Sequence, residues 1–327
     1  MKMEFLMDIL RAIASLRVPA FDLIFSLITM MGEETFFLIF AIIFLWCVDK
    51  REGYYILFVG LFGIVINQFL KMLFRIPRPW VYDPSFKPVD SAIEAATGYS
   101  FPSGHTQNIA GTLGAVAAYN RRRWVTVTSV AVILLVGFSR MYLGVHTLLD
   151  VGVSLIVGLV VVLALRYPFS TEERFRRFMP ILSLVGILFA AAYVIYVHLV
   201  SSDPMLDADN LNSAMKNAYT MIGCLAGLLP VYFIDLKIVR FDTRAVWYVQ
   251  LIKLIVGFAV VMLFKVGLSS PLVALFGNEY VARAVRYFII VIFAGLLWPM
   301  CFGYLSRIRI AALDSLGAKA SARIKGR

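Results

Sequence analysis

Long apolar stretches, separated by short polar or basic connections, run through most of the 327 residues. Nine of them have the composition of helices that cross a bilayer, which takes roughly 20 residues with some latitude. They are residues 34–48, 53–74, 107–120, 124–139, 147–165, 178–199, 214–235, 246–267 and 283–304. An earlier stretch, 19–31, is short, so it is either a first span completed by polar neighbours or a half-inserted helix. The pattern predicts an all-α polytopic transmembrane helical bundle with nine or ten spans.

The first residues follow a different pattern. Within residues 5–16, charged side chains alternate with apolar ones at helical spacing, namely Phe5, Leu6, Ile9, Leu10 and Ile13. This spacing suits an interfacial amphipathic helix, and a frayed helical extension is an equal alternative. Glu4, Asp8 and Arg11 interrupt the stretch, and no small-residue cleavage site follows. We therefore expect no cleaved signal peptide and an N-terminus that stays on the mature protein.

The composition excludes a soluble globular protein. Hydrophobic residues make up 61% of the chain and charged residues 16%, and the mean hydropathy is +0.84. These values lie far outside the range of soluble domains. The three cysteines, Cys47, Cys224 and Cys301, stand singly in predicted spans, with no histidine or acidic ligand at metal spacing. We interpret them as small apolar packing residues.

Basic residues are concentrated in alternate connections. The basic connections are 50–51, 121–123, 166–177, 237–244 and the tail 307–327. Because positive charge stays on the cytoplasmic side of membrane proteins, we expect these connections inside. The connections expected outside are 75–106, 140–146, 200–213 and 268–282. A cationic rim beside anionic lipid headgroups explains the net charge of +11, so we expect no nucleic-acid partner.

The polar connector after residue 166 divides the chain into regions of different content. We expect a motif-bearing core at 1–166, a cytoplasmic connector at 167–177, a four-span membrane region at 178–306 and a basic cytoplasmic tail at 307–327. Lys253 and Asp235 lie in or at the edge of apolar spans, where ionisable groups are expensive. A polar cavity, a lipid-entry wall and a dimer contact are possible interpretations, and buttressing is the favoured one. His198 ends a span and is interpreted as an interfacial residue.

Two cations stand at the outer end of the stretch 53–74. Lys71 lies about one helical turn from that end, and Pro77 and Pro79 stop the helix, so that the chain turns across the mouth with Arg78 facing in. A phosphate dianion at a membrane surface needs several donors whose charge persists at neutral pH, and guanidinium groups supply bidentate contacts. Lys71, Arg78 and the later Arg140 are candidates. Taken alone, Lys71 or Arg78 fits snorkelling to the interface better.

Ser103, Gly104 and His105 come just before an apolar span. A hydroxyl, a backbone amide without side-chain bulk and a helix N-terminus converge there and can bind an anion. His105 lies at the rim, where a histidine can protonate a leaving oxygen because its unperturbed pKa is near the working pH. An N-cap serine beside an exposed histidine explains the segment equally well.

His146 and Asp150 form the third candidate group. They are four residues apart, so on one helix they share a face and can hydrogen-bond. The pairing fixes the tautomer of the imidazole and leaves its other nitrogen free to attack phosphorus. Arg140, on the turn before this helix, can stabilise charge on the transferring oxygens. A buried structural His–Asp pair is the alternative, yet an acidic residue within a span is a functional candidate by default.

Together, the three segments resemble the signature of the type 2 phosphatidic acid phosphatase family. That signature is a Lys followed after six residues by Arg-Pro, then Pro-Ser-Gly-His, then Ser-Arg, five residues, His, three residues and Asp. Residues 71–79, 102–105 and 139–150 meet every position in this order. The resemblance covers roughly residues 19–166 and implies a helical-bundle lipid phosphatase.

The resemblance also implies a role for each matching residue. His146 is the expected nucleophile, forming a phosphohistidine, Asp150 orients it, and His105 donates a proton to the leaving group. The residues expected to hold the phosphate are Lys71, Arg78, Ser103, Gly104 and Arg140. No cofactor or metal is implied, and no carboxylate cluster suited to magnesium accompanies the motifs.

The implied activity is hydrolysis of a lipid phosphate or diphosphate on the extracytoplasmic side of an integral membrane protein, in a bacterial cytoplasmic membrane. The stretch 68–79 and the run 139–150 are similar to the sphingosine-phosphate phosphatase branch, whereas Ser103-Gly104-His105 differs from the Ser-Thr-His of that branch. Trp80, directly after Arg78-Pro79, is a faint similarity to the glucose-phosphate phosphatases. Isoprenoid diphosphates, phosphatidic acid or phosphatidylglycerol phosphate, and sphingoid-base phosphates stay open as substrates.

Two alternatives from other classes use the same site. A phospholipid transporter or flippase would use the same arginines, but its binding would survive loss of His146, whereas hydrolysis would not. A vanadate haloperoxidase is disfavoured because that chemistry is typical of soluble relatives. The expected partners are the amphiphilic phosphorylated substrate and membrane lipids, and nothing in the sequence supports an oligomer.

Overall fold

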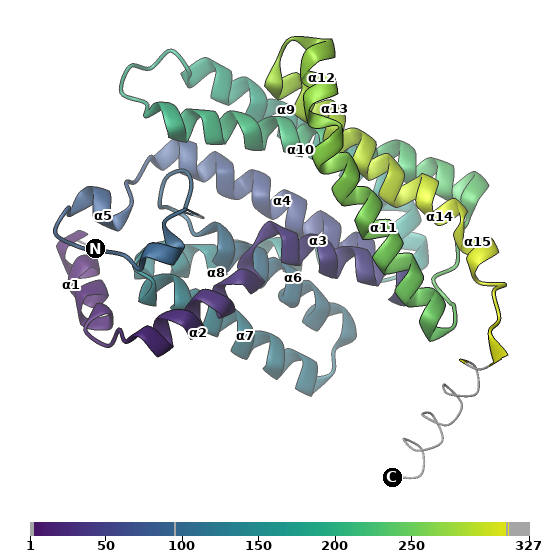
Figure 1. The fold of residues 1–327 in the computed structure, drawn as a ribbon, viewed down its shortest axis with the longest axis horizontal. Helices are drawn as coiled ribbons and strands as arrows, with labels where there is room; N and C mark the ends of the chain where they lie inside the picture. Colours follow the sequence, from purple (N-terminus) through teal and green to yellow (C-terminus); the bar gives the residue numbers. More distant parts are fainter. Residues whose placement is uncertain (1–2, 95, 312, 314–327) are drawn as a thin grey trace. The chain divides into compact units, whose positions relative to one another are not determined.

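The computed structural model describes residues 3–94, 96–311 and 313, and the regular structure in these ranges is entirely helical (Figure 1). The α-helices are α1 (Met3–Ala14), α2 (Pro19–Thr29), α3 (Glu34–Ile43), α4 (Lys50–Phe74), α5 (Pro79–Tyr82), α6 (Gly104–Asn120), α7 (Arg123–Tyr142), α8 (Leu148–Arg166), α9 (Glu172–Val200), α10 (Ala208–Ile234), α11 (Trp247–Gly267), α12 (Ser269–Phe276), α13 (Glu279–Ile292), α14 (Trp298–Met300) and α15 (Phe302–Leu305). The 3-10 turns are η1 (Met30–Gly32) and η3 (Asp90–Ala92), and the π-helical turns are η2 (Phe44–Val48), η4 (Asp235–Val239) and η5 (Phe293–Leu297). The predicted all-α bundle is confirmed, whereas most of the predicted tail 307–327 lies outside the described residues.

Within the described ranges, seven helical segments are long and apolar enough to cross a membrane. They are Lys50–Tyr82, Arg123–Tyr142, Leu148–Arg166, Glu172–Val200, Ala208–Val239, Trp247–Gly267 and Glu279–Leu305. The pair Met3–Ala14 and Pro19–Gly32, bent by 118°, makes an eighth if it is one span.

The count by length is therefore lower than the nine or ten spans predicted. All nine predicted stretches lie on helices, but 34–48 and 107–120 fall on the short helices Glu34–Val48 and α6. Helix α6 has 17 residues because Ser103 caps its start and Arg121 takes a left-handed conformation, with φ of 55°, at its end.

The chain divides into two compact units, Met1–Ala41 with Tyr54–Ile222 and Ile42–Gly53 with Gly223–Arg327. The first unit thus extends beyond the expected core at 1–166 and includes α9. Contacts between distant segments explain the difference. The Tyr196 hydroxyl of α9 donates to the carbonyl oxygen of Met72 at 3.3 Å, and Phe69 of α4 lies 4.8 Å from the Tyr196 ring.

Helix α6 is the packing centre of the first unit and lies against α7 and α8 (Figure 1). Ile109 and Leu113 of α6 are buried together with Val136 of α7. Gly158 of α8 comes so close to α6 that a Cβ atom there would lie 2.9 Å from Ala110. Small residues allow such close approach of membrane helices. The packing brings the N-terminal ends of α6 and α8 together.

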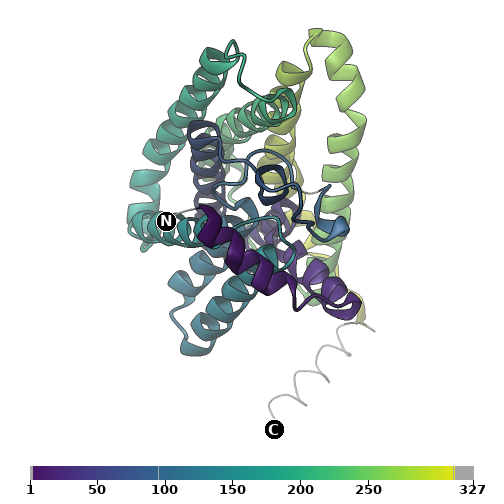
Figure 2. The same cartoon turned by 90° about the vertical axis from the view of Figure 1, so that its left-hand side faces the viewer.

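Helix α1 lies beside the loop that follows α5 (Figures 1 and 2). Met7 and Leu10 of α1 are buried against Phe86, and Arg11 pairs with Asp83 at 2.7 Å. Of the apolar residues predicted to share a face, Leu6 and Leu10 are buried together with Met7, whereas Phe5 is exposed. The position of this helix in a membrane interface stays a prediction.

The second unit contains the two buried ionisable residues singled out from the sequence. Asp235 accepts from Lys50 at 2.7 Å. Lys253 is fully buried, donates to the carbonyl oxygen of Thr243 at 3.1 Å and lies 4.4 Å from the centre of the Phe302 ring. Each group thus has partners of its own, which supports the buttressing interpretation.

Candidate active site

The three segments singled out from the sequence meet in the first unit, where α6 and α8 begin. A terminal guanidinium nitrogen of Arg78 lies 3.0 Å from His146 Nε2 and joins the first segment to the third. The backbone N–H of Ser103 donates to the Asp150 carbonyl oxygen at 3.2 Å and joins the second segment to the third. All the site residues expected from the sequence therefore belong to one largely buried cluster.

Asp150 is held in place by the start of α8. Its carboxylate oxygen Oδ2 accepts from the backbone N–H of Thr147 at 2.7 Å, while Thr147 Oγ1 accepts from the Asp150 N–H at 3.3 Å. This capping box accounts for the beginning of the helix at Leu148. The Ser100 hydroxyl donates to the same carboxylate oxygen at 2.7 Å. The carboxylate is thus fixed by groups other than the histidine.

His146 lies before α8, not on it, which corrects the expectation that it shares a helix face with Asp150. The capping box is the reason, because it uses Thr147 as the N-cap and leaves His146 in the preceding turn. His146 Nδ1 nevertheless lies 3.5 Å from Asp150 Oδ2. Because an arginine can only donate, Nε2 beside Arg78 is the accepting nitrogen and Nδ1 carries the proton. This tautomer has its lone pair on Nε2.

Lys71 and Arg78 are buried and tied to backbone carbonyls, so neither snorkels to an interface. The Arg78 guanidinium donates to the carbonyl oxygens of Gly98 at 3.0 Å, Thr97 at 2.7 Å and Val145 at 3.0 Å. Lys71 Nζ donates to the carbonyl oxygen of Tyr99. These bonds orient both cations before any ligand is bound.

Arg140 is almost completely buried and has a partner that is remote in the sequence. One terminal nitrogen donates to Thr29 Oγ1 at the end of α2, at 2.7 Å, while its Nε has no partner among the described residues. The N-terminal segment therefore contributes to the site. Gly32 of η1 also belongs here, because a Cβ atom on it would lie 2.8 Å from the carbonyl oxygen of His105.

Ser103 is the N-cap of α6 and His105 lies in the first turn of that helix. Ser103 Oγ accepts from the N–H of Thr106 at 3.4 Å and from its hydroxyl at 3.0 Å. The capping interpretation of Ser103 therefore holds, but His105 is not exposed, and its Nε2 is buried. A Cβ atom on Gly104 would lie 3.7 Å from Asn67 Oδ1, an ordinary contact distance, so an added methyl group would not clash there.

The electrostatics of the cluster favour a neutral His146. This residue lies in the turn between α7 and α8, and burial lowers the pKa of its imidazole well below the ordinary value of 6.5. The positive charges of Arg78, Arg140 and Lys71 lower the pKa further. At neutral pH the ring is therefore uncharged, the form in which Nε2 can act as a nucleophile.

Several polar atoms of the cluster are buried without a hydrogen-bond partner among the described residues. They are His105 Nε2, His146 Nδ1, Arg140 Nε and Asn67 Oδ1. Buried polar groups are normally satisfied, so this concentration makes the cluster a candidate ligand site. In the described part of the chain, no group of three or more His, Cys, Asp or Glu residues is placed to hold a metal ion.

Sequence reasoning missed three residues of the cluster. Asn67 precedes Lys71 by one helical turn on α4, and its amide donates to Gln107 Oε1 at 3.0 Å, so the periodicity of a buried polar face would have found it. Ser100 lies close to the second segment and carried no signal of its own. Thr29 precedes Arg140 by 111 residues, and no local pattern connects the two.

Comparison with known families fits this arrangement. Residues 51–174 match the family described as the PAP2 superfamily, and residues 219–310 match the transmembrane extension of PAP2 superfamily phosphatases. This chain belongs to the PAP2 superfamily. The superfamily match includes all the candidate site residues, and the extension falls mostly on the second unit.

Curated PAP2 relatives have different names. The chain is 31% identical to a probable sphingosine-1-phosphate phosphatase of Dictyostelium discoideum, over 47% of this chain and 40% of the relative. It is 33% identical to the undecaprenyl-diphosphatase BcrC of Bacillus subtilis, over 35% and 55%. It is 26% identical to the phosphatidylglycerophosphatase B of the same bacterium, over 36% and 61%. The matches thus span about two fifths to three fifths of the relatives, and no solved structure matches.

Proposed function

We propose that this protein is an integral membrane phosphatase that hydrolyses an amphiphilic phosphate monoester or diphosphate through a phosphohistidine on His146. The observation that carries the proposal is the position of the imidazole. Its Nε2 faces a guanidinium nitrogen of Arg78 at 3.0 Å, and its Nδ1 faces the Asp150 carboxylate at 3.5 Å. A phosphate that takes up the Arg78 contact brings its phosphorus to the nucleophilic nitrogen.

The first half of the reaction transfers the phosphoryl group to the enzyme. Lys71, Arg78, Arg140 and the N–H groups at the start of α6 hold the phosphate oxygens. The Nε2–P bond forms while the bond between phosphorus and the leaving oxygen breaks. His105 gives a proton to that oxygen, and the nearby phosphate dianion favours the protonated form of this histidine before transfer. Asp150 stabilises the positive charge that develops on the His146 ring.

The second half returns the enzyme to its starting state. His105, now neutral, takes a proton from a water molecule, and the oxygen of that water attacks phosphorus. The Nε2–P bond breaks, inorganic phosphate leaves and His146 is neutral again. We propose that no metal takes part, in keeping with the family resemblance of the motifs.

The substrate class follows from the names of the relatives. A sphingoid-base phosphate, an isoprenoid diphosphate and a glycerophospholipid phosphate share a terminal phosphate on a long apolar body. We propose a substrate of this kind, reached from the extracytoplasmic side that the basic connections predict for the site. The apolar body would lie in the bilayer while the phosphate enters the cluster.

The test is inorganic phosphate release by the purified full chain in detergent with EDTA, using those lipid classes. His146→Ala is expected to lower turnover at least about 10⁴-fold, because the covalent route disappears. His198→Ala is the matched control, since this exposed histidine bonds to Tyr219 at 3.0 Å, away from the cluster. An alkali-stable phosphoenzyme in the wild type, absent from His146→Ala, would identify the intermediate. Tight lipid binding without any phosphate release would contradict the proposal and favour transport.

A further inference from the structure

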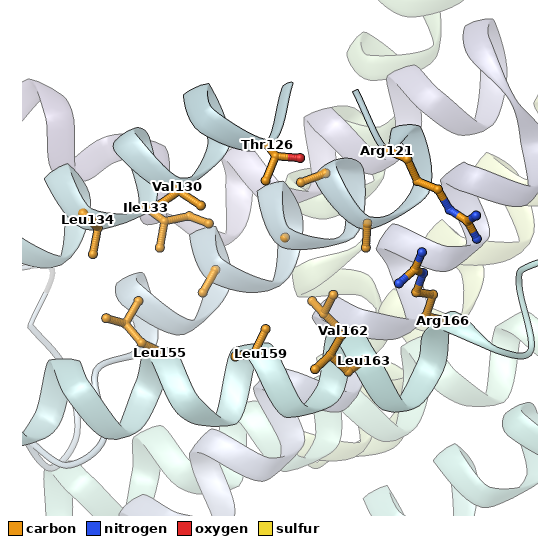
Figure 3. A pocket seen from close by; sticks show the side chains of 14 residues that line it. Arg121, Thr126, Val130, Ile133, Leu134, Leu155, Leu159, Val162, Leu163 and Arg166 are labelled. Atoms are coloured by element: carbon orange, nitrogen blue, oxygen red, sulfur yellow. The ribbon is translucent and has the colours of Figure 1, made fainter. Parts of the chain in front are cut away.

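An apolar groove with two cationic residues at one end lies between α6, α7 and α8 (Figure 3). Its volume is about 460 Å³. Leucines of α7 and α8, among them Leu134, Leu159 and Leu163, form its wall, and Arg121 and Arg166 lie at its end. The three leucines are each more than half exposed, so the protein itself leaves this wall uncovered.

The groove is separate from the candidate active site. Arg121 directly follows α6, whereas His105 lies in the first turn of the same helix. The 17 residues of α6 separate the two ends by about 25 Å, at a rise of roughly 1.5 Å per residue. A phosphate bound beside His146 therefore cannot contact Arg121.

The two guanidinium groups, which carry like charges, converge at the end of the groove. Figure 3 shows the side chains of Arg121 and Arg166 turned toward one another across the end of the groove. Neither guanidinium group has a hydrogen bond or ion pair with any residue that the structure describes, although the backbone N–H of Arg121 donates to the Ala117 carbonyl oxygen at 3.1 Å. Like charges that converge beside an apolar surface repel each other unless an anion lies between them. The arrangement calls for an anionic group that accepts from both.

We propose that this groove binds one anionic glycerophospholipid, with its phosphodiester between Arg121 and Arg166 and an acyl chain along the leucine wall. Only a ligand with a negative headgroup and an apolar chain matches both parts of the groove. The charge rule places the same end beside the cytoplasmic leaflet, where anionic headgroups attract basic residues.

The lipid is a ligand and not a substrate, because a phosphodiester has no terminal phosphate to release. The inference therefore goes beyond the proposed phosphatase activity and does not depend on it. Binding at this end would hold α6, α7 and α8 together opposite the site that the same helices build.

Native mass spectrometry of the full chain in detergent tests the proposal, with phosphatidylglycerol and phosphatidylcholine as probes. We expect one phosphatidylglycerol to stay bound at collision energies that remove phosphatidylcholine. The double variant Arg121→Gln/Arg166→Gln should weaken phosphatidylglycerol retention about tenfold or more, since two charge-assisted contacts are lost. Ala118→Leu, which fills the groove without changing charge, should weaken it as well.

Arg123→Gln is the matched control, because this arginine lies at the same end but does not line the groove. It should retain phosphatidylglycerol as the wild type does. Equal retention of both lipids by the wild type, or undiminished phosphatidylglycerol retention by the double variant, would overturn the proposal. The thermal unfolding temperature of each variant, compared with the wild type, provides the check on folding.

Discussion

Buried ionisable groups occur in both units, and the protein satisfies them to different degrees. In the second unit, Asp235 pairs with Lys50, and Lys253 has both the Thr243 carbonyl oxygen and the face of Phe302. In the first unit, buried nitrogens of His105, His146 and Arg140 have no hydrogen-bond partner among the described residues, although His146 Nδ1 faces Asp150 Oδ2 at 3.5 Å. A buried charge within a membrane protein is a functional candidate by default. Arg286 Nε of the second unit also has no hydrogen-bond partner among the described residues, so the concentration of such atoms in one cluster, and not a single missing partner, distinguishes the candidate site.

The unpartnered atoms also have an energetic cost. A buried polar atom without a hydrogen-bond partner costs about 1–3 kcal/mol of folding stability. Several such atoms in one cluster would therefore destabilise a purely structural element. A phosphate offers oxygens that accept from Arg140 Nε and from a protonated His105 Nε2, and it removes that part of the cost on binding. The second unit has no need of a ligand to complete Asp235 or Lys253. Four predictions test this contrast.

Asp150→Asn should give the largest effect of these four. The amide oxygen can still accept from Ser100 and from the Thr147 N–H, so the fold is expected to remain. The negative charge that faces His146 is lost, and turnover should decrease about 10³-fold or more. Asp203→Asn, which removes the carboxylate partner of Arg75, is the control. Turnover of Asp150→Asn within the range of that control would refute the role of the carboxylate.

Arg78→Lys should have the next largest effect. The guanidinium donates to three carbonyl oxygens as well as to His146, and a single ammonium group cannot reproduce that fork. We expect kcat/KM to fall about 10²-fold. Arg75→Lys is the matched control, because Arg75 is on the same segment and pairs with Asp203. Similar losses in both variants would show that the orientation of Arg78 has no special importance.

Much of the fold and of the site could be predicted because the signals are local. The apolar stretches gave the helices, and the spacing within three short segments gave the residues of the cluster. The prediction that failed depended on the residue at which a helix begins. His146 was placed on a helix because a four-residue spacing suggests one, but the Thr147–Asp150 capping box starts α8 after the histidine.

Contacts between distant segments were beyond sequence reasoning. Thr29 meets Arg140 only because α2 packs along α7. The inclusion of α9 in the first unit depends on contacts such as that of Tyr196 with Met72, and no pattern within either helix encodes that pairing. Each of these contacts is set by tertiary packing, which cannot be predicted from the composition of a single stretch.

Lys253→Met tests a buried ionisable residue of the second unit and should have a small effect. The side chain is fully buried and already satisfied, and replacing a buried charge by an apolar group of similar size is often neutral. We expect stability to change by no more than about 2 kcal/mol and phosphate release to stay at the wild-type level. Thermal unfolding followed by the activity assay measures both. A loss of activity like that of Arg78→Lys would remove the distinction between the units.

The smallest effect concerns the charge of the His146 ring. Its pKa lies well below 6.5, chiefly because of burial and then because of Arg78, Arg140 and Lys71. NMR of histidine-labelled protein, with His146→Ala to assign the signal, should therefore give a titration midpoint below 6.5. The folded state binds this proton less tightly than the unfolded chain, so its contribution to stability should decrease as the pH falls below 6.5. Orthophosphate should raise the midpoint, because an anion in the cluster offsets the three cations. A midpoint at or above 6.5 without phosphate would mean that the cluster does not hold the ring neutral, and the nucleophile would then need another route to its uncharged form.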